Sequence, residues 1–290
     1  MEYIGTCLWF NDQAEEAAHF YCSIFPGSGI ERTLPYGPSA ASASGRPAGS
    51  VMTVEFKIEN TPFLALNGGS RFRIDPSISF FVSCESEDEM EEKWNKLKKT
   101  VRMDLATYPF AKRYGWCEDR FGVNWQLVLG SGCQKISPAL FFSNKNFGKG
   151  GEAIAFYVSI FPDSRVNTIA KDQKSTAILH SRITLANKEF VVFEGPTDPA
   201  HDFSPAVSFV LGCDSQEEID AIWKRLSDTP EDGQCGWLQD PYGVSWQVVP
   251  KDWGKWLLEA DPEKRERLMQ EVLRMKKIDM TRLSETMQGH

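Results

Sequence analysis

Two short segments in the second half of the chain carry side chains that could do acid–base chemistry. In ILHSRITL, His180 and Arg182 lie two residues apart, so they share one side of a predicted strand. The returning segment FVVFEGP supplies Glu194. An imidazole, a guanidinium and a carboxylate can together move a proton and stabilise a developing oxyanion. We therefore predict His180, Arg182 and Glu194 as catalytic residues; the alternative is that they are solvated strand residues.

Further candidates for a binding site recur in both halves. A tryptophan precedes a turn, and a glutamine stands in the last predicted strand of each half. The segments VMTVEFKI and FLALNGG add a carboxylate and an amide in the first half. The second half is favoured because only its strand combines a group that titrates near neutral pH with a fixed cation. We predict ligand-binding roles for Trp237 and Gln247 beside the catalytic set, and for Glu55, Asn67, Trp116 and Gln126 in an alternative first-half site.

These residues belong to a sequence that is duplicated. AHFYCSIFPGS in the first half corresponds to IAFYVSIFPDS in the second, and GWCEDRFGVNWQLV corresponds to GWLQDPYGVSWQVV. A repeat of more than about 100 residues is a domain-sized module, far longer than a solenoid repeat. We predict modules at residues 1–130 and 137–250. Two such modules can pair about a pseudo-twofold axis and enclose a cleft.

The two halves predict the same order of elements. Each opens with a short apolar strand and continues with an amphipathic helix, at residues 15–24 and 151–160. A hairpin and a third apolar strand follow. A second helix begins at Ser86 or Ser215, each with a glutamate three residues later, which is the spacing of a capping box. The last strand follows a turn, and the whole is an α+β fold.

Three segments are predicted from turn chemistry and composition. Asp119 and Asp240, in DRFG and DPYG, indicate Asx turns. Residues 37–50 are rich in small residues and indicate a mobile loop. Residues 251–290 indicate a helical extension with one apolar face, which docks on the body or on a second subunit. A homodimer is therefore one expected assembly.

Composition excludes several classes of partner. The net charge of -8 argues against nucleic acid or an anionic membrane. No apolar run approaches the ~20 residues that span a bilayer, and the N-terminal segment lacks the pattern of a secretory signal. The seven cysteines include no CxxC pair, which is typical of reduced thiols. We expect a cytoplasmic protein with a small-molecule ligand.

The chain resembles a known family through CLWFNDQAEEAAHFYCSIFPGS, FLALNGG, ISFFVSC and GWCEDRFGVNWQLV, with corresponding motifs in the second half. It resembles the PhnB-like family, also labelled demethylubiquinone methyltransferase-like, of the vicinal oxygen chelate superfamily of glyoxalase I and bleomycin-resistance proteins. The resemblance implies two tandem βαβββ modules, each curling into part of a cup. The methyltransferase label finds no support in the sequence, because no glycine-rich nucleotide loop follows a strand.

The resemblance also implies a divalent metal held by His, Glu or Gln from several strands. Carried over position by position, these ligands fall on residues that are poor donors, namely Gly5 or Thr6, Ala65, Ser77, Pro138, Val192 and Ala206. Only the last-strand positions keep a donor, Gln126 and Gln247. We therefore expect no metal and no cofactor.

Three hypotheses for function stay open on the sequence alone. The first is a metal-independent lyase, isomerase or cyclase that acts on an oxygenated organic substrate by acid–base chemistry. The second is a non-catalytic protein that sequesters a ligand, as bleomycin-resistance proteins do. The third is a structural or regulatory subunit, suggested by the acidic composition and the helical tail.

Overall fold

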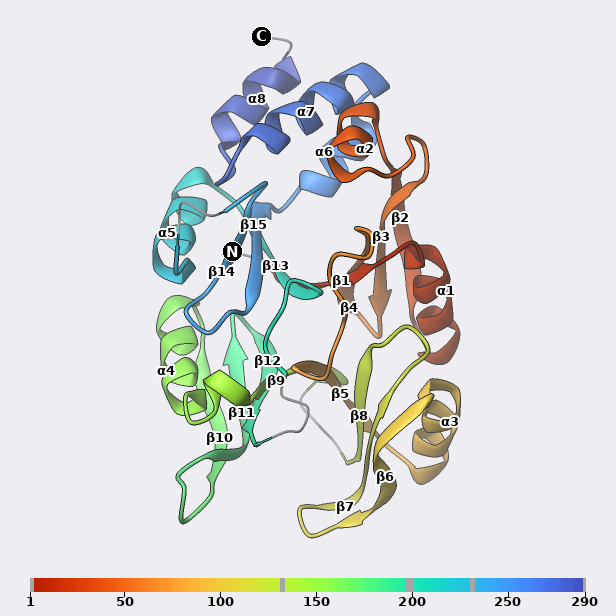
Figure 1. Ribbon diagram of the computed structural model, residues 1–290, viewed down its shortest axis with the longest axis vertical. Helices are drawn as coiled ribbons and strands as arrows, with labels where there is room; N and C mark the ends of the chain where they lie inside the picture. The colour runs from red at the N-terminus through yellow and green to blue at the C-terminus, as the bar shows by residue number, and fades with distance from the viewer. Residues whose placement is uncertain (1–2, 131–133, 197–200, 230–232, 289–290) are drawn as a thin grey trace.

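The computed structural model describes residues 3–130, 134–196, 201–229 and 233–288 (Figure 1). Two mixed β-sheets form the body. Four helices lie on their outer faces: α1 (Ala14–Ile24), α3 (Glu87–Leu97), α4 (Gly150–Ile160) and α5 (Gln216–Leu226). Their buried residues join the sheets in one apolar core, whose largest fully buried side chains include Trp125 and Trp246.

The seven strands of the first sheet are, in spatial order, β14 (Trp237–Gln239), β15 (Ser245–Pro250), β13 (Val207–Cys213), β1 (Tyr3–Phe10), β4 (Thr61–Asn67), β3 (Val51–Ile58) and β2 (Gly29–Pro35). The eight strands of the second sheet are β10 (Arg165–Lys171), β11 (Ile178–Leu185), β12 (Lys188–Glu194), β9 (Ile136–Phe142), β5 (Ile78–Cys84), β8 (Asn124–Leu129), β7 (Ala111–Glu118) and β6 (Thr100–Tyr108).

Each sheet combines strands from both repeats. In the first sheet, β1 pairs antiparallel with β13, with Cys7 opposite Ser208, and so joins β1–β4 of the first repeat to β13–β15 of the second. In the second sheet, β5 pairs antiparallel with β9, with Phe81 opposite Ser137. Each sheet is therefore built by the beginning of one repeat and the end of the other.

The α+β class, the tandem repeat and the C-terminal helices are confirmed. The structure adds that each repeat contains two units in which a strand, a helix and further strands follow one another. In the first repeat these units are β1–α1–β2–β3–β4 and β5–α3–β6–β7–β8. The last unit of the second repeat has only β14 and β15 after α5 in the described residues. Each sheet is thus a pair of units from different repeats.

Some elements differ from the sequence predictions. Residues 37–50 are not one continuous loop, because they contain a short helix, α2 (Pro38–Ser44), with proline at its start and Gly45 at φ 71° after its end. Proline in the first turn and a left-handed glycine at the end are the usual helix boundaries. Strands β2, β6, β7, β10 and β14 were also not predicted. Both capping boxes are confirmed, since Ser86 and Ser215 accept hydrogen bonds from the backbone of Glu89 and Glu218.

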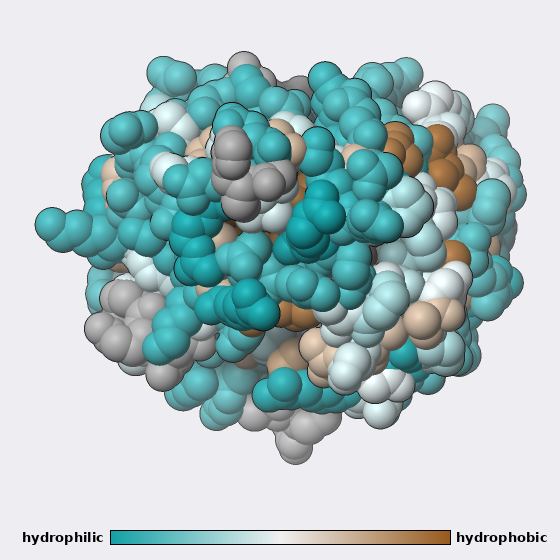
Figure 2. All heavy atoms as spheres, turned by 90° about the horizontal axis from the view of Figure 1, so that it is seen from above, coloured by the Kyte–Doolittle hydropathy of each residue, from teal (hydrophilic) through white to brown (hydrophobic). Residues whose placement is uncertain are grey.

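The C-terminal extension docks on the body of its own chain. It forms α6 (Trp253–Glu259), α7 (Pro262–Arg274) and α8 (Met280–Gln288), at the top of Figure 1 beside α2. The backbone N–H groups of Cys235 and Gly236 donate to the carbonyls of Met275 and Lys276, both at 2.8 Å. The apolar face is buried, and the outward face of this end of the molecule is mostly hydrophilic (Figure 2). No helix of the described residues is long and apolar enough to span a bilayer.

A buried aspartate fastens the first helix of each repeat to its last strand. Asp119 Oδ2 accepts from the hydroxyl of Tyr21 and the indole N–H of Trp125, both at 2.8 Å. Its Oδ1 accepts from the backbone of Phe121 and Val123, so the predicted Asx turn is confirmed.

The second repeat repeats this network around Asp240. Its Oδ2 accepts from Tyr157 and Trp246, at 2.7 and 2.9 Å, and its Oδ1 accepts from two backbone N–H groups. Burial raises the pKa of both carboxyls from 3.8 to about 6, against the lowering effect of the hydrogen bonds.

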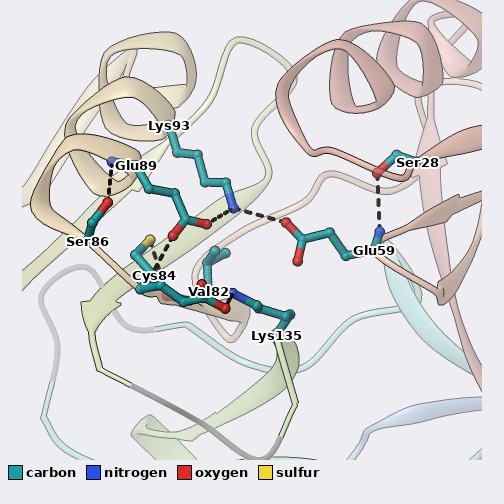
Figure 3. Close-up of polar contacts among 9 residues, drawn as sticks. Ser28, Glu59, Val82, Cys84, Ser86, Glu89, Lys93 and Lys135 are labelled. Atoms are coloured by element: carbon teal, nitrogen blue, oxygen red, sulfur yellow. Dashed lines mark hydrogen bonds and ion pairs between the residues drawn. The ribbon is translucent and has the colours of Figure 1, made fainter.

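A buried lysine joins the two units of the first repeat (Figure 3). Lys93 of α3 has a side chain that is 4% exposed, and its Nζ lies 2.7 Å from Glu89 Oε1 and 3.0 Å from Glu59 Oε1. Glu59 belongs to the turn between β3 and β4. The ammonium also lies over the ring of Phe25, 5.0 Å from its centroid. In the second repeat, Ile222 and Ala186 stand at the places of Lys93 and Glu59.

Candidate functional site

The best-formed cavity lies on the inner face of the first sheet, beneath α6 and α7, and has a volume of about 230 Å³. Its apolar wall comes from both repeats and from the C-terminal extension. The wall includes Leu64 and Leu66 of β4, Val210 of β13, Val249 of β15, and Trp253 and Leu257 of α6. This mixture follows from the topology, because β4 and β15 belong to the same sheet. A concave, mostly apolar pocket with a few polar groups is the usual form of a small-molecule site.

Charged residues at this cavity include an ion pair on its sheet, and Glu31 and Lys251 also line the cavity. Arg32 of β2 donates from Nε to Glu55 Oε2 at 2.8 Å, and its Nη2 also contacts that oxygen. The two side chains are 30% and 21% exposed. Among the described residues, none donates a hydrogen bond to Glu55 Oε1. The cavity therefore offers a carboxylate oxygen that is available to a ligand, while Arg32 neutralises the charge.

Helix α6, which covers part of the cavity, approaches the carboxylate of Glu55 closely. Gly254 is in the first turn of α6, and a Cβ at this position would lie 2.2 Å from Glu55 Oε1. Only glycine permits this approach without movement of the helix or of the glutamate. The first turn of α6 therefore packs against the charged pair at the border of the cavity.

Gln247 belongs to a buried polar group on the same sheet. Its Nε2 donates to Ser208 Oγ at 3.0 Å. Cys7 lies opposite Ser208, and burial raises the pKa of its thiol to about 11, although hydrogen bonding with Gln247 and Ser208 acts in the opposite direction. The thiol is therefore protonated at neutral pH, and it is a poor nucleophile.

Trp237 lines the cavity beside this group. Its ring packs edge-on against Trp9, with centroids 6.2 Å apart. The structure therefore brings together three of the residues predicted from sequence, Glu55, Trp237 and Gln247, although two of them come from the second repeat and one from the first.

His180 and Arg182 lie on β11 of the second sheet, apart from Trp237 and Gln247. Burial, followed by the charge of Arg182, lowers the pKa of His180 to about 4, so the imidazole is neutral at pH 7. Arg182 pairs with the buried carboxylate of Glu189 at 2.5 Å, and Ser137 donates to the same carboxylate. The expected grouping of second-half residues in one cup is not what the structure has, because β11 and β15 belong to different sheets.

Glu194 and Asn67 serve the backbone. Glu194 accepts from Gly150 N at 2.8 Å and from Ile178 N at 2.5 Å. Asn67, at the corresponding place, accepts from Ala14 N at 2.8 Å and donates to a carbonyl of β3. Each side chain secures the start of a helix to the adjacent hairpin. The oxygen atoms of both are thus committed to the fold.

Aromatic side chains cover the inner face of the second sheet. Phe141 and Phe193 stack with centroids 4.5 Å apart, and Trp116 meets both edge-on. Gln126 donates to Ser79 and accepts from the hydroxyl of Tyr114. Trp116 and Gln126 therefore lie together, but they lie apart from Glu55, with which the sequence grouped them.

Several lining residues were missed by the sequence analysis. Arg32 lies on β2, whose residues are mostly exposed and show no clear alternation. Trp253, Leu257 and Met269 come from the extension. The apolar face of the extension predicted that it docks, but the spacing of apolar residues carries no information about which surface receives the helices.

The described residues do not fit the divalent-metal site that the resemblance implies. No group of three or more His, Cys, Asp or Glu side chains converges in the described part of the chain. Gln247 and Gln126 each hydrogen-bond a serine on a neighbouring strand. We derive no chemical step that uses a metal.

Comparison with known structures gives the class of fold. A glyoxalase I mutant from Zea mays aligns over 87% of this chain and 95% of its own, with a TM-score of 0.54 at 11% identity. This similarity shows a shared fold. A PhnB protein from Bacillus cereus is 33% identical over 43% of this chain and 98% of its own, with a TM-score of 0.40. A lactoylglutathione lyase from Agrobacterium tumefaciens is 17% identical over 43% and 90%, with a TM-score of 0.28. A search of curated proteins gave no match.

The family follows from the sequence. The model of the 3-demethylubiquinone-9 3-methyltransferase family matches residues 2–128 and 134–249, one match for each repeat. The chain belongs to this family, which is the PhnB-like family that its sequence resembles.

Proposed function

We propose that the protein binds a small organic molecule in the cavity of the first sheet, with Glu55 Oε1 accepting a hydrogen bond from it. The observation that carries this proposal is a partly open, mostly apolar cavity that contains a carboxylate oxygen without a donor among the described residues. A ligand that supplies an O–H or N–H group would satisfy this oxygen. Its apolar body would lie against Leu64, Leu66 and Trp237.

We further propose that the site catalyses a lyase or isomerase type of reaction by acid–base chemistry. One oxygen of Glu55 is held by Arg32, and the other faces the cavity, next to Gly254. A carboxylate in this position can take a proton from a carbon or oxygen of the ligand and return it elsewhere on the same molecule. In this mechanism Glu55 takes the role that the sequence analysis gave to His180 and Glu194.

Sequestration without turnover is the second candidate. The cover formed by α6 and α7 favours it, because a ligand held beneath two helices is shielded from solvent. We also propose the cytoplasm as the location, on the ground that the six cysteines in the described residues are free thiols.

Binding is tested by NMR of the tryptophan indole N–H groups during titration with a library of small neutral and charged organic fragments. We expect binders to shift the signal that is absent in Trp237→Phe. The signal that is absent in Trp116→Phe, from the second sheet, should not move. Fragments that perturb only the Trp116 signal would contradict the proposed site.

Catalysis is tested with the same binders in D₂O. We expect Glu55 to exchange a carbon-bound proton of an activated ligand, so that its NMR signal decays with protein present. Glu55→Gln should abolish the decay and retain part of the binding. Glu118→Gln is the matched control, because Glu118 also pairs with an arginine and is similarly exposed, at 24%, on the second sheet. Binding without exchange would support sequestration instead.

A further inference from the structure

A second cavity, of about 120 Å³, lies beside the first, between α2, α6 and α7. In Figure 1 these three helices lie together above the first sheet. The two cavities share four apolar lining residues: Leu34, Met52, Leu257 and Met269. The cavities therefore meet at these side chains.

The second cavity offers a ligand mainly apolar contacts. Three polar side chains line it, and each is already hydrogen-bonded to the backbone. The hydroxyl of Tyr36 donates to Asn67 O at 2.7 Å, Arg265 Nε donates to Leu257 O at 2.6 Å, and Glu266 accepts from Ser39 N at 2.8 Å. The other oxygen of Glu266, Oε2, lies against Gly37 at the edge of this cavity. A polar ligand group placed among the apolar side chains would lose its water without gaining a partner.

The boundary between the cavities is adaptable. Met52 and Met269 are unbranched and have three rotatable bonds, so they can repack around a ligand more easily than branched side chains can. The frame around them is held firmly. Glu266 reaches the start of α2 so closely that a Cβ at Gly37 would lie 2.6 Å from its Oε2.

We infer that the ligand is amphiphilic, with a hydrogen-bond-donating head at Glu55 and a linear apolar tail that passes Met52 and Met269 into the second cavity. This inference rests on the proposed function, since it places the head in the same site. It narrows the ligand class, because a compact polar molecule would leave the second cavity unused. The four shared apolar residues and the mostly apolar lining beyond them carry the inference.

The experiment is a titration of the full-length protein with straight-chain 1-alkanols from propanol to decanol. Neutral alcohols are chosen because a net charge of -8 would attract alkylamines to the whole surface. We expect the dissociation constant to fall about fourfold for each methylene that becomes buried. The fall should end when the tail fills both cavities.

Met269→Trp separates the inference from the proposed function. The larger side chain at the boundary should keep the binding of propanol and butanol and stop the gain at a shorter chain than in the wild type. Met269→Leu is the matched control and should keep the full gain. The thermal midpoint of each variant shows whether it is folded.

If the affinity of the wild type and of a folded Met269→Trp variant stops rising at the same alkanol length, the second cavity takes no tail. That result overturns the inference, while the proposed site stands. If no alcohol shifts the Trp237 signal, both are contradicted.

Discussion

Asp119 and Asp240 illustrate how burial can outweigh hydrogen bonding. Each carboxylate accepts two side-chain and two backbone hydrogen bonds, which favour its charged form. Desolvation nevertheless raises the pKa of each from 3.8 to about 6. Both repeats keep the same arrangement, so it belongs to the architecture of the repeat and not to the ligand site of one sheet.

A pH dependence of stability follows from these raised pKa values. Between pH 4 and 6 the folded state binds more protons at Asp240 than the unfolded state does. The contribution of Asp240 to the free energy of unfolding is therefore greatest at low pH and is lost as the pH rises through 6. We expect Asp240→Asn to lower the free energy of unfolding by about 1–3 kcal/mol at every pH. The reason is that the NH₂ group of asparagine cannot accept the hydrogen bonds that a carboxylate oxygen accepts. The variant's loss of stability between pH 4.5 and 7.5 should also be smaller than that of the wild type.

Urea denaturation at a series of pH values measures this difference. Asp172→Asn is a useful control, because backbone and side-chain hydrogen bonds from Ser175 lower the pKa of Asp172, so that its contribution has the opposite sign. If the free energy of unfolding of Asp240→Asn changes with pH as steeply as that of the wild type, Asp240 does not have the raised pKa.

At the scale of elements, the cavity depends on how closely α6 approaches β3. Gly254→Ala should force the first turn of α6 and the Glu55 carboxylate apart, since the added Cβ would lie 2.2 Å from Oε1. We expect weaker fragment binding and faster hydrogen exchange in α6, with a loss of stability of about 1–2 kcal/mol. Exchange measured by mass spectrometry reports the movement.

Gly151→Ala is the matched control for this change. Gly151 is also the second residue of a helix, but its nearest neighbour to an added Cβ is Ile178 Cδ1, at 3.9 Å. Alanine there should be neutral or stabilising by up to about 1 kcal/mol. Equal behaviour of the two variants would show that the approach of Gly254 to Glu55 does not hold α6 in place.

The lysine cluster of Figure 3 leads to a prediction about the link between two units. Lys93→Ile alone should destabilise the protein by about 1–3 kcal/mol, because Glu59 and Glu89 lose their cation in a partly buried place. Lys93→Ile with Glu59→Ala copies the apolar pair Ile222 and Ala186 of the second repeat. We expect the double variant to be more stable than Lys93→Ile, as measured by urea denaturation. Simple additivity of the two changes would show that the residues are not coupled.

The sequence predicted helices more completely than strands, for a physical reason. The caps at Ser86 and Ser215 and the stripes of α1 and α4 are local signals, because a helix satisfies its own backbone. Strand β10 is exposed along its whole length, and so its sequence lacks the alternation that marks a half-buried strand.

The site could be predicted only in part for a related reason. The hairpin that carries His180 and the strand that carries Gln247 belong to one repeat, and so we expected them in one cup. Strand pairing is a non-local choice that these sequence patterns do not encode, and the structure pairs β1 with β13 across the repeats. Glu55, Trp237 and Gln247 therefore line one cavity, whereas His180 lies on the other sheet.

At the scale of the whole molecule, duplication has produced two related surfaces with different contents. Glu55 lies opposite Leu64 in the first sheet, and Arg182 lies opposite Val191 at the corresponding place in the second. The charge at this place is thus reversed: Glu55 pairs with Arg32, and Arg182 pairs with Glu189. Aromatic rings occupy the second surface, whereas helices from the extension cover a cavity on the first.

The central claim is that the cavity of the first sheet, built by both repeats and covered by α6 and α7, is the ligand site. The most direct measurement is a crystal structure of the full chain with the tightest-binding fragment from the NMR titration. We predict an ordered fragment beneath α6, with a donor group within hydrogen-bond distance of Glu55 Oε1. A fragment bound instead on the inner face of the second sheet, beside Trp116 and His180, with the first cavity empty, would contradict the claim.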